Sequence, residues 1–423
     1  MKGLKSILRP TKRGDDRRRS RDYAPFALRI GRGGVTCAAP LALTAAAVAA
    51  AIGVAVSAAA QTGSILEYAV PTANSQPVSL VAGPDGNLWF TEFRGNKIAR
   101  MRTAGTVTEF SIPTVNSQPD DMDVGPDGNL WFAEVLGNRI GRITPEGVIT
   151  EFLVPTPNSR PTVVAAGPDG NLWFTERGTL ASPGNKVGRI TPEGAITEWT
   201  LPNASSRPLG ITAGPDGNVW FTEQAGNRIG RIDPATGVIT EFPLPNPSSQ
   251  PWEITAGPDG NVWFTEFSGN RIGRITPEGV ISEFAVPTAA SQPNTIRRGP
   301  DLNPGDNCAY QRETLGEPAF AARYGSFGGC VARLATTKTL WFTETAGNRI
   351  AQVTTAGDIF EYPIPTAASQ PIGITQGPDG AVWVAEFAAN KIGRLDVKTV
   401  GKPIAPGVRG DDPTPVDPTE LSE

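Results

Sequence analysis

The sequence predicts an all-β fold, a seven-bladed β-propeller of four-stranded blades that is closed by the N-terminal strand. Three observations predict it. A Gly-Pro-Asp-Gly-Asn-Leu-Trp-Phe-Thr-Glu segment recurs with small changes seven times, mostly 42 or 43 residues apart. Each repeat carries four short β-prone segments separated by turn residues. The fourth segment occurs once before the first repeat and is missing after the last. The repeated tryptophans are Trp89, Trp131, Trp173, Trp220, Trp263, Trp341 and Trp383.

The first repeat shows how each strand is predicted. The first strand, Pro77–Ala82, follows Ser-Gln-Pro and ends at the Gly-Pro-Asp-Gly turn. The second, Leu88–Glu92, ends at a Gly-Asn turn, and the third, Lys97–Met101, ends at Thr-Ala-Gly. The fourth, Val107–Ile112, ends at a proline. Four strands in 42 residues match the size of a propeller blade.

The two ends of the repeated region predict how the ring closes. A Glu-aromatic pair marks the fourth strand of six repeats, and a further copy, Glu67-Tyr68, precedes the first tryptophan. The last repeat stops after its third strand, at Leu395. We therefore expect the strand near Ile65–Val70 to complete the blade that contains Trp383, which removes a free sheet edge.

Residues 1–60 are predicted to be a secretory signal peptide. Residues 1–35 carry eleven Lys/Arg against three Asp, and residues 36–60 are uncharged, mostly apolar and end in three alanines. We expect cleavage after Ala60. The alternative is an uncleaved anchor, because the apolar run is just long enough to span a bilayer. Either way the body is exported, to the cell envelope or outside the cell.

The propeller is predicted to occupy residues 61–399, followed by a disordered tail at 400–423 that is rich in Pro and Asp. The whole chain has a formal charge of −4, and its first 35 residues carry +8, so the rest carries −12. Such an acidic body argues against nucleic-acid binding. We expect a monomer that contacts a membrane only through an uncleaved anchor.

The chain contains no histidine, which excludes a Ser-His-Asp triad, a Cys-His pair and His-ligated zinc. The sixth repeat carries an insertion at residues 302–339, which holds the only two cysteines of the body, Cys308 and Cys330. Export favours a disulfide between them. The insertion is either a tolerated surface loop or a binding loop.

Residues found in every repeat are expected to be structural, because an active site is normally made once. Each repeat has a Glu after its Trp and a base after the Asn of the second turn, which predicts one salt bridge or hydrogen bond per blade. The single Asp of each Gly-Pro-Asp turn supplies too few oxygens for calcium.

Function is instead expected where the repeats differ, at the starts of the innermost strands. Unique polar, charged and aromatic residues there are predicted to lie near the central channel. Either they form a wet channel mouth without a specific ligand, or Trp252 stacks on a ligand while the acids bind a cation or polar groups. The set consists of Asp120, Asp121, Asp123, Trp252, Glu253, Asn294 and Arg297.

Over residues 64–396 or so, the repeat resembles the streptogramin B lyases, also called virginiamycin B lyases. The resemblance rests on GPDGN[LV]WFTE, on GN[KR]IGRITP and on ITEF. It implies a seven-bladed propeller and the magnesium-dependent opening of cyclic depsipeptide antibiotics by elimination at an ester bond. The metal site is unknown from the sequence. Because the Ser-x-Pro loops and the insertion lie on opposite faces of the ring, the disulfide loop should face away from the site that the resemblance implies.

This chain departs from the pattern at the catalytic positions. The resemblance implies histidines after the proline of innermost strands and a Glu that can precede it. The residues after the proline are Val78, Asp120, Thr162, Leu209, Trp252, Asn294 and Ile372. The residues before it are Gln76, Gln118, Arg160, Arg207, Gln250, Gln292 and Gln370. Asp120 and Glu253 are the remaining candidates for a base, provided that burial raises their pKa.

The sequence therefore predicts an exported, lyase-like propeller that binds a ligand or acts as a scaffold without catalysis. The ligand would be a small molecule, a peptide or a cell-surface group. The alternative is a magnesium-dependent carbon–oxygen lyase or lactonase that acts on cyclic esters with a carboxylate base. A purely structural envelope protein is a third possibility.

Overall fold

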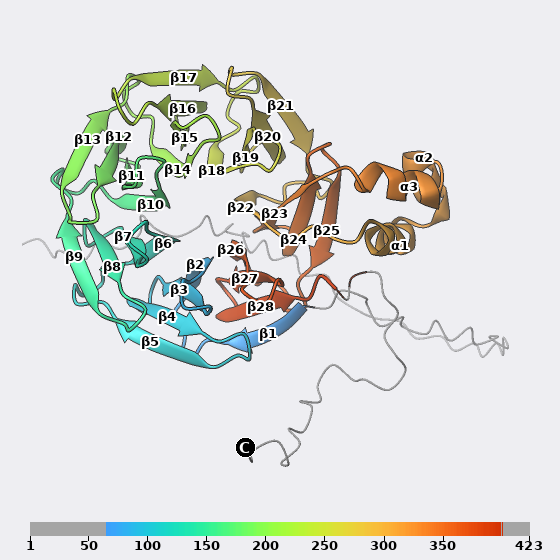
Figure 1. Ribbon diagram of the computed structural model, residues 1–423, viewed down its shortest axis with the longest axis horizontal. Coiled ribbons are helices and arrows are strands. Elements are labelled where there is room, and N and C mark those ends of the chain that lie inside the picture. The colour runs from blue at the N-terminus through green and yellow to red at the C-terminus, as the bar shows by residue number, and fades with distance from the viewer. Residues whose placement is uncertain (1–64, 399, 401–423) are drawn as a thin grey trace, which may run out of the picture. The chain divides into compact units, whose positions relative to one another are not determined.

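The computed structural model describes residues 65–398 and residue 400. The predicted signal peptide, its cleavage site and nearly all of the predicted tail lie outside these residues. The described chain forms seven four-stranded antiparallel sheets arranged in a ring (Figure 1). None of its helices is long and apolar enough to cross a membrane. The predicted seven-bladed propeller is confirmed.

Each blade runs from an innermost strand at the centre of the ring to an outermost strand at the rim (Figure 1). The first blade consists of β2 (Pro77–Ala82), β3 (Leu88–Glu92), β4 (Lys97–Met101) and β5 (Val107–Ser111). The second and third consist of β6 (Pro119–Val124), β7 (Leu130–Glu134), β8 (Arg139–Ile143) and β9 (Ile149–Leu153), and of β10 (Pro161–Ala166), β11 (Leu172–Gly178), β12 (Pro183–Ile190) and β13 (Ile196–Thr200).

The fourth and fifth blades consist of β14 (Pro208–Ala213), β15 (Val219–Glu223), β16 (Arg228–Ile232) and β17 (Ile239–Pro243), and of β18 (Pro251–Ala256), β19 (Val262–Glu266), β20 (Arg271–Ile275) and β21 (Ile281–Ala285). The sixth consists of β22 (Pro293–Arg298), β23 (Thr339–Glu344), β24 (Arg349–Thr354) and β25 (Ile359–Pro363). The seventh consists of β26 (Pro371–Gln376), β27 (Val382–Glu386), β28 (Lys391–Leu395) and β1 (Ile65–Ala69).

Ring closure follows the prediction. β1 pairs antiparallel with β28, with Ile65 opposite Leu395. A side-chain contact reinforces the joint, because Lys391 Nζ lies 2.6 Å from a carboxylate oxygen of Glu67. The first strand of the propeller thus becomes the outermost strand of its last blade.

The hydrophobic core lies between neighbouring blades. Trp89 and Ile98 of the first blade pack with Met122, Phe132 and Ile143 of the second. The second strand is buried along its whole length in six blades and, in the third, everywhere except at Arg177, whereas most outermost strands alternate between exposed and half-buried residues. Adjacent blades therefore share one apolar interface, and the tryptophan of each repeat lies in it.

Six blades hold their tryptophan with the same polar contacts, which we call the Trp clasp. In the first blade the Trp89 indole N–H donates to Asp85 at 2.9 Å. Arg100 lies over the same ring at 5.6 Å and approaches Asp85 at 3.8 Å. The other clasp tryptophans are Trp131, Trp173, Trp220, Trp263 and Trp383.

The simplest form of the prediction was a salt bridge between the Glu that follows each repeated Trp and the base that follows the Asn of the second turn. In the structure these two residues do not bind each other. Lys97 Nζ binds Glu109 of the outermost strand at 2.5 Å. Glu92 is fully buried beneath the Gly-Asn turn, where a Cβ on Gly95 would lie 2.6 Å from its carboxylate. Burial, followed by the nearby charge of Glu109, raises the pKa of Glu92 to about 7. The repeated residues are structural, but the salt bridge joins the third strand to the fourth.

The insertion forms three short helices rather than a loop, and the sequence did not predict them. They are α1 (Pro304–Leu315), α2 (Glu317–Tyr324) and α3 (Phe327–Leu334), which lie outside the ring beside β24 and β25 (Figure 1). We call residues 304–334 the helical cap. The predicted disulfide is present, since Cys308 of α1 bonds to Cys330 of α3.

Candidate binding site at the centre of the ring

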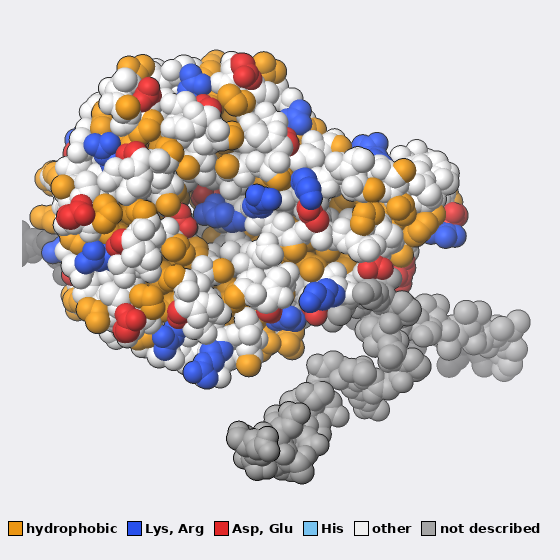
Figure 2. Space-filling view, in the orientation of Figure 1, with side chains coloured by type: hydrophobic (Ala, Val, Ile, Leu, Met, Phe, Trp, Pro, Cys, Tyr) orange, Lys and Arg blue, Asp and Glu red, His pale blue; other side chains and the backbone are white. Residues whose placement is uncertain are grey.

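The innermost strands place most of the unique residues around the axis of the ring. Figure 2 shows a hollow at this centre with basic and acidic side chains beside it. Asp121 lies on β6, Glu253 on β18 and Arg297 on β22. The three residues come from the second, fifth and sixth blades, so a contact between Arg297 and Asp121 crosses the centre of the ring, whereas one between Arg297 and Glu253 joins neighbouring blades.

Arg297 joins the two carboxylates. Its Nη1 lies 3.0 Å from Glu253 Oε1, and its Nη2 lies 3.7 Å from Asp121 Oδ1. The Arg297 side chain is 26% exposed, whereas those of Asp121 and Glu253 are 10% and 7% exposed. The guanidinium therefore faces the channel and covers both acids.

Asp121 and Asp123 also hold neighbouring blades together. The Ser79 hydroxyl donates to Asp121 at 2.7 Å, and the backbone N–H of Val164 donates to it at 3.3 Å. Asp123 accepts from the backbone N–H of Ala166 at 3.0 Å. Asp123 thus ties the second blade to the third.

Burial dominates the electrostatics of this cluster. It raises the pKa of Asp121 to about 8, against the effect of Arg297, and it raises the pKa of Glu253 as well. Burial opposes the charge of Arg297, but Glu253 and Asp121 raise the Arg297 pKa above its usual value. Arg297 therefore stays positive and attracts the charged form of either acid.

Trp252 belongs to a different group of residues. Its ring stacks on Phe267 with centroids 4.6 Å apart, and the Arg177 guanidinium lies over it at 5.0 Å. Arg177 also donates to the side-chain oxygen of Gln224 at 3.0 Å. These residues come from the third, fourth and fifth blades, at the ends where the Ser-x-Pro loops and Gly-Asn turns lie. We call the face of the ring that carries these loops and turns the Pro-loop face. The opposite face, which carries the Gly-Pro-Asp turns, is the Asp-turn face.

Asp120 and Asn294 are the second residues of β6 and β22. Asn294 is 6% exposed, and its side-chain oxygen accepts from Thr295 at 3.4 Å. Asp120 is half-buried, and its backbone carbonyl accepts from Thr91 at 2.6 Å. The structure thus brings together Asp121, Glu253 and Arg297 and separates them from Trp252.

Sequence reasoning missed Arg177, Gln224 and Phe267. The signal that would have found them is the position after the repeated Glu, which differs from blade to blade. Because the first proline of each innermost strand pairs with that Glu, the next residue lies beside the Ser-x-Pro loop. The residues at this position are Phe93, Val135, Arg177, Gln224, Phe267, Thr345 and Phe387.

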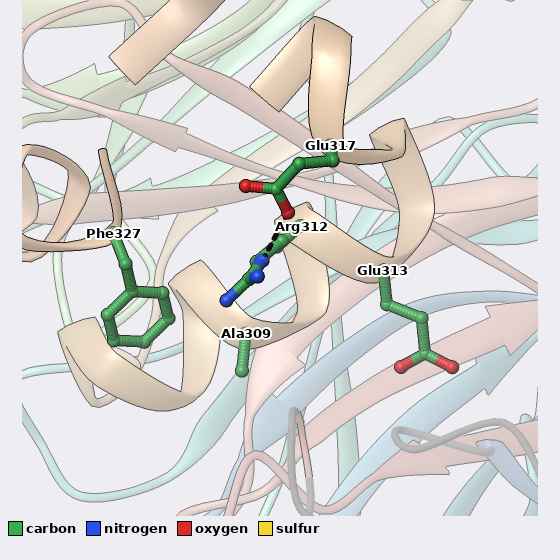
Figure 3. A pocket seen from close by; sticks show the side chains of 5 residues that line it. All are labelled: Ala309, Arg312, Glu313, Glu317 and Phe327. Atoms are coloured by element: carbon green, nitrogen blue, oxygen red, sulfur yellow. Dashed lines mark hydrogen bonds and ion pairs between the residues drawn. The ribbon is translucent and has the colours of Figure 1, made fainter. Parts of the chain in front are cut away.

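A second hollow lies on the helical cap, with a volume of about 370 Å³ (Figure 3). Ala309, Arg312, Glu313, Glu317 and Phe327 line it. Arg312 and Glu317 form an ion pair at 2.5 Å, but their side chains are 53% and 65% exposed. An exposed pair of this kind contributes little to binding or stability. This pocket has none of the residues predicted for the site.

Comparison with known proteins identifies the family. The model of the virginiamycin B lyase family matches residues 30–304 and 321–402. The chain belongs to the virginiamycin B lyase family. Solved structures agree: a streptogramin B lyase has 35% sequence identity and a TM-score of 0.66, covering 78% of this chain and 97% of that one. Virginiamycin B lyase from Staphylococcus aureus has 36% identity and the same TM-score, covering 78% and 98%.

A third solved structure concerns a residue that a virginiamycin B lyase needs for catalysis. It is a catalytically inactive histidine-to-alanine variant of the Staphylococcus aureus enzyme with quinupristin, at 36% identity and a TM-score of 0.66, covering 78% of this chain and 98% of that one. The present member of the virginiamycin B lyase family has no histidine among its 423 residues. No histidine is therefore available in this chain for the role that the replaced histidine has in that enzyme.

The described residues do not suit magnesium, the cofactor that the resemblance implies. Within residues 65–398 no three carboxylate or cysteine side chains gather where they could hold a metal ion. The two central acids face the Arg297 guanidinium, whose positive charge would repel a second cation. The described residues at the centre of the ring therefore do not fit magnesium.

Proposed function

We infer that this protein is an exported ligand-binding member of the virginiamycin B lyase family that does not catalyse elimination. One observation carries the proposal: the Arg297 guanidinium contacts both Asp121 and Glu253. A base must reach the α-proton of its substrate. Here the buried acids turn toward an arginine that covers them, so neither is free to take that proton.

The ligand would bind on the Pro-loop face, around Trp252. This ring is partly exposed and framed by Phe267 and Arg177. Partly exposed aromatic side chains suit a ligand with a flat apolar part. The basic leader followed by an apolar run supports export, and one closed ring supports a monomer.

The test is a lyase assay. The full chain is incubated with a type B streptogramin and magnesium, and linearisation is followed by mass spectrometry. We expect no ring opening, and we expect saturable, Trp252-dependent binding of ligands in calorimetry. Ring opening that disappears in the Asp120→Asn/Glu253→Gln variant would contradict the proposal.

One observation favours the alternative, a carbon–oxygen lyase or lactonase with a carboxylate base. Burial raises the pKa of Asp121 to about 8, within the range that a general base needs near neutral pH. Such a reaction would require Arg297 to move away from the acids. An Arg297→Gln variant separates the two functions: a lyase held back by Arg297 would gain turnover, whereas a binding protein would remain inactive.

A further inference from the structure

The charges on the Pro-loop face are unequal around the ring. In the third and fourth blades an arginine precedes the first proline of the innermost strand, and a further arginine, Arg177, follows the repeated Glu of the third blade. In the other five blades the residue before the proline is a neutral glutamine. Three arginines, Arg160, Arg177 and Arg207, therefore lie together on two adjacent blades.

Arg177 lies in a hairpin that is longer than those of the other blades, and its side chain reaches the fifth blade. β11 and β12 have seven and eight residues, against five in most second and third strands. Backbone hydrogen bonds fix the hairpin, from Gly178 N–H to the Ser159 carbonyl at 2.8 Å and from Arg207 N–H to the Gly184 carbonyl at 3.0 Å. From this position the guanidinium passes Gln224 and reaches the Trp252 ring.

Arg160 and Arg177 differ in their partners from the arginines of the Trp clasps. On the Asp-turn face each arginine of a Trp clasp approaches the aspartate of its own blade, as Arg189 approaches Asp169 at 3.2 Å. Among residues 65–398, by contrast, neither Arg160 nor Arg177 forms an ion pair with a carboxylate. Arg177 contacts only a neutral amide and an aromatic face. No carboxylate of the described residues pairs with its positive charge.

We propose that the Trp252 site selects ligands in which an anionic carboxylate or phosphate is attached to a flat ring. This inference rests on the proposed binding function and deepens it. The ring would lie beside Trp252 and Phe267, and the oxyanion would accept hydrogen bonds from Arg177, with Arg160 adding positive charge nearby. The planar guanidinium fork matches both oxyanions.

Four probes that share a naphthalene ring system but differ in charge test the proposed preference for anionic ligands. The full chain is titrated by calorimetry with 2-naphthoate, 2-naphthyl phosphate, 2-naphthylmethanol and 2-naphthylmethylamine. We expect at least one anion to bind about tenfold more tightly than the alcohol, the size of one charge-assisted hydrogen bond. We expect the amine to bind more weakly than the alcohol. The two anions distinguish a carboxylate ligand from a phosphate ligand.

Single substitutions test which residues produce the expected preference for anionic ligands. Arg177→Gln should abolish the anion advantage and leave alcohol binding unchanged, whereas Trp252→Ala should weaken all four probes. Arg102→Gln removes an exposed charge from the Asp-turn face and should change nothing. Thermal melting checks that each variant folds.

Equal binding of anion and alcohol, tighter binding of the amine, or no Trp252-dependent binding of any probe would overturn the inference. The binding function is overturned separately, by turnover in the lyase assay. A second measurement tests the positive charge around Trp252 without any of the four probes. Iodide should quench the fluorescence of Trp252, measured as the difference from Trp252→Phe, more strongly than caesium does. Equal quenching would also count against the inference.

Discussion

The sixth blade and the other six solve the same packing problem on the Asp-turn face in different ways. Elsewhere an arginine lies over the tryptophan and an aspartate accepts its N–H. In the sixth blade Gln352 stands opposite Trp341 where the others have the arginine, and the indole N–H donates to the Pro300 carbonyl at 3.0 Å. Asn307 of α1 then binds Gln352 at 3.1 Å.

The helical cap thus replaces the Trp clasp. Tyr310 stacks on Tyr362 at 4.9 Å, and Phe320 and Cys308 lie in the same buried cluster as Trp341. Arg333 anchors α3 by binding Asp358 at 2.6 Å. The difference teaches that a repeat position can lose its local polar contacts when an inserted segment covers the same surface.

The largest expected effect tests whether the Trp clasp and the helical cap stabilise their blades equally. Trp220 and Trp341 are 0% and 1% exposed. Truncating either to alanine should lower the free energy of unfolding by about 3–5 kcal/mol, the usual cost of emptying such a site. Urea denaturation measures both variants. A much smaller loss for Trp341→Ala would show that the cap packs less well than the clasp.

Removal of the disulfide should affect the sixth blade alone. The Cys308–Cys330 bond closes a loop with a sequence separation of 22, which contributes about 3 kcal/mol in the chain-entropy model. We expect the Cys308→Ala/Cys330→Ala variant to lose stability of this order, with faster hydrogen exchange confined to the cap and the strands β24 and β25. Uniformly faster exchange around the ring would contradict a local role.

The buried glutamates are a feature that the sixth blade shares with the rest. Burial, followed by a neighbouring glutamate charge, raises the pKa of Glu134 and of Glu344 to about 8. The folded state therefore holds protons that the unfolded state has lost, so stability should fall as pH rises from about 5 to 8. The slope is at most about 1.4 kcal/mol per pH unit for each group.

Glutamine keeps the shape of the acid but cannot ionise. Glu344→Gln and Glu134→Gln should each flatten the decline of the free energy of unfolding with pH, by similar amounts. Glu317→Gln is the matched control, because that side chain is 65% exposed. Parallel pH profiles for the wild type and both buried-site variants would show that these acids ionise without cost.

The smallest effect comes from exchanging one residue between the two kinds of blade. Arg231→Gln gives the fourth blade the residue of the sixth and removes a contact with Asp216 at 3.6 Å. Because this pair is partly exposed, the loss should be about 1 kcal/mol or less. Thermal melting measures it, and a loss as large as that of a tryptophan would mean that the clasp, rather than packing, holds the blade.

The repeats made the fold predictable almost to the residue. Seven copies of the same turns and β-prone segments place the strands, and the predicted fourth strand of the first blade differs from β5 by one residue. The cap was not predictable in this way. Its helices occur once, α1 has almost no amphipathic pattern, and their stability comes from the disulfide and from tertiary contacts with the sixth blade.

The candidate site was predictable only in part. Comparing equivalent positions brought out Asp121, Glu253 and Arg297, because a charged residue among apolar equivalents is conspicuous. It did not separate Trp252 from them, since the direction of each side chain depends on the bulge in the innermost strand. Arg177 occupies the same repeat position as Val135 or Gln224, and its reach to the fifth blade depends on a long side chain whose direction no sequence periodicity reports.

The pairing of β1 with β28 has a consequence for the order of assembly. Chains are synthesised from the N-terminus, so Ile65 is available long before its partner Leu395 exists. Blades one to six can form as they emerge, whereas the seventh must wait for nearly the whole propeller. A chain truncated before Lys391 would leave β1 without the strand that it borders. Closure thus acts as a check that translation has reached the end of the ring.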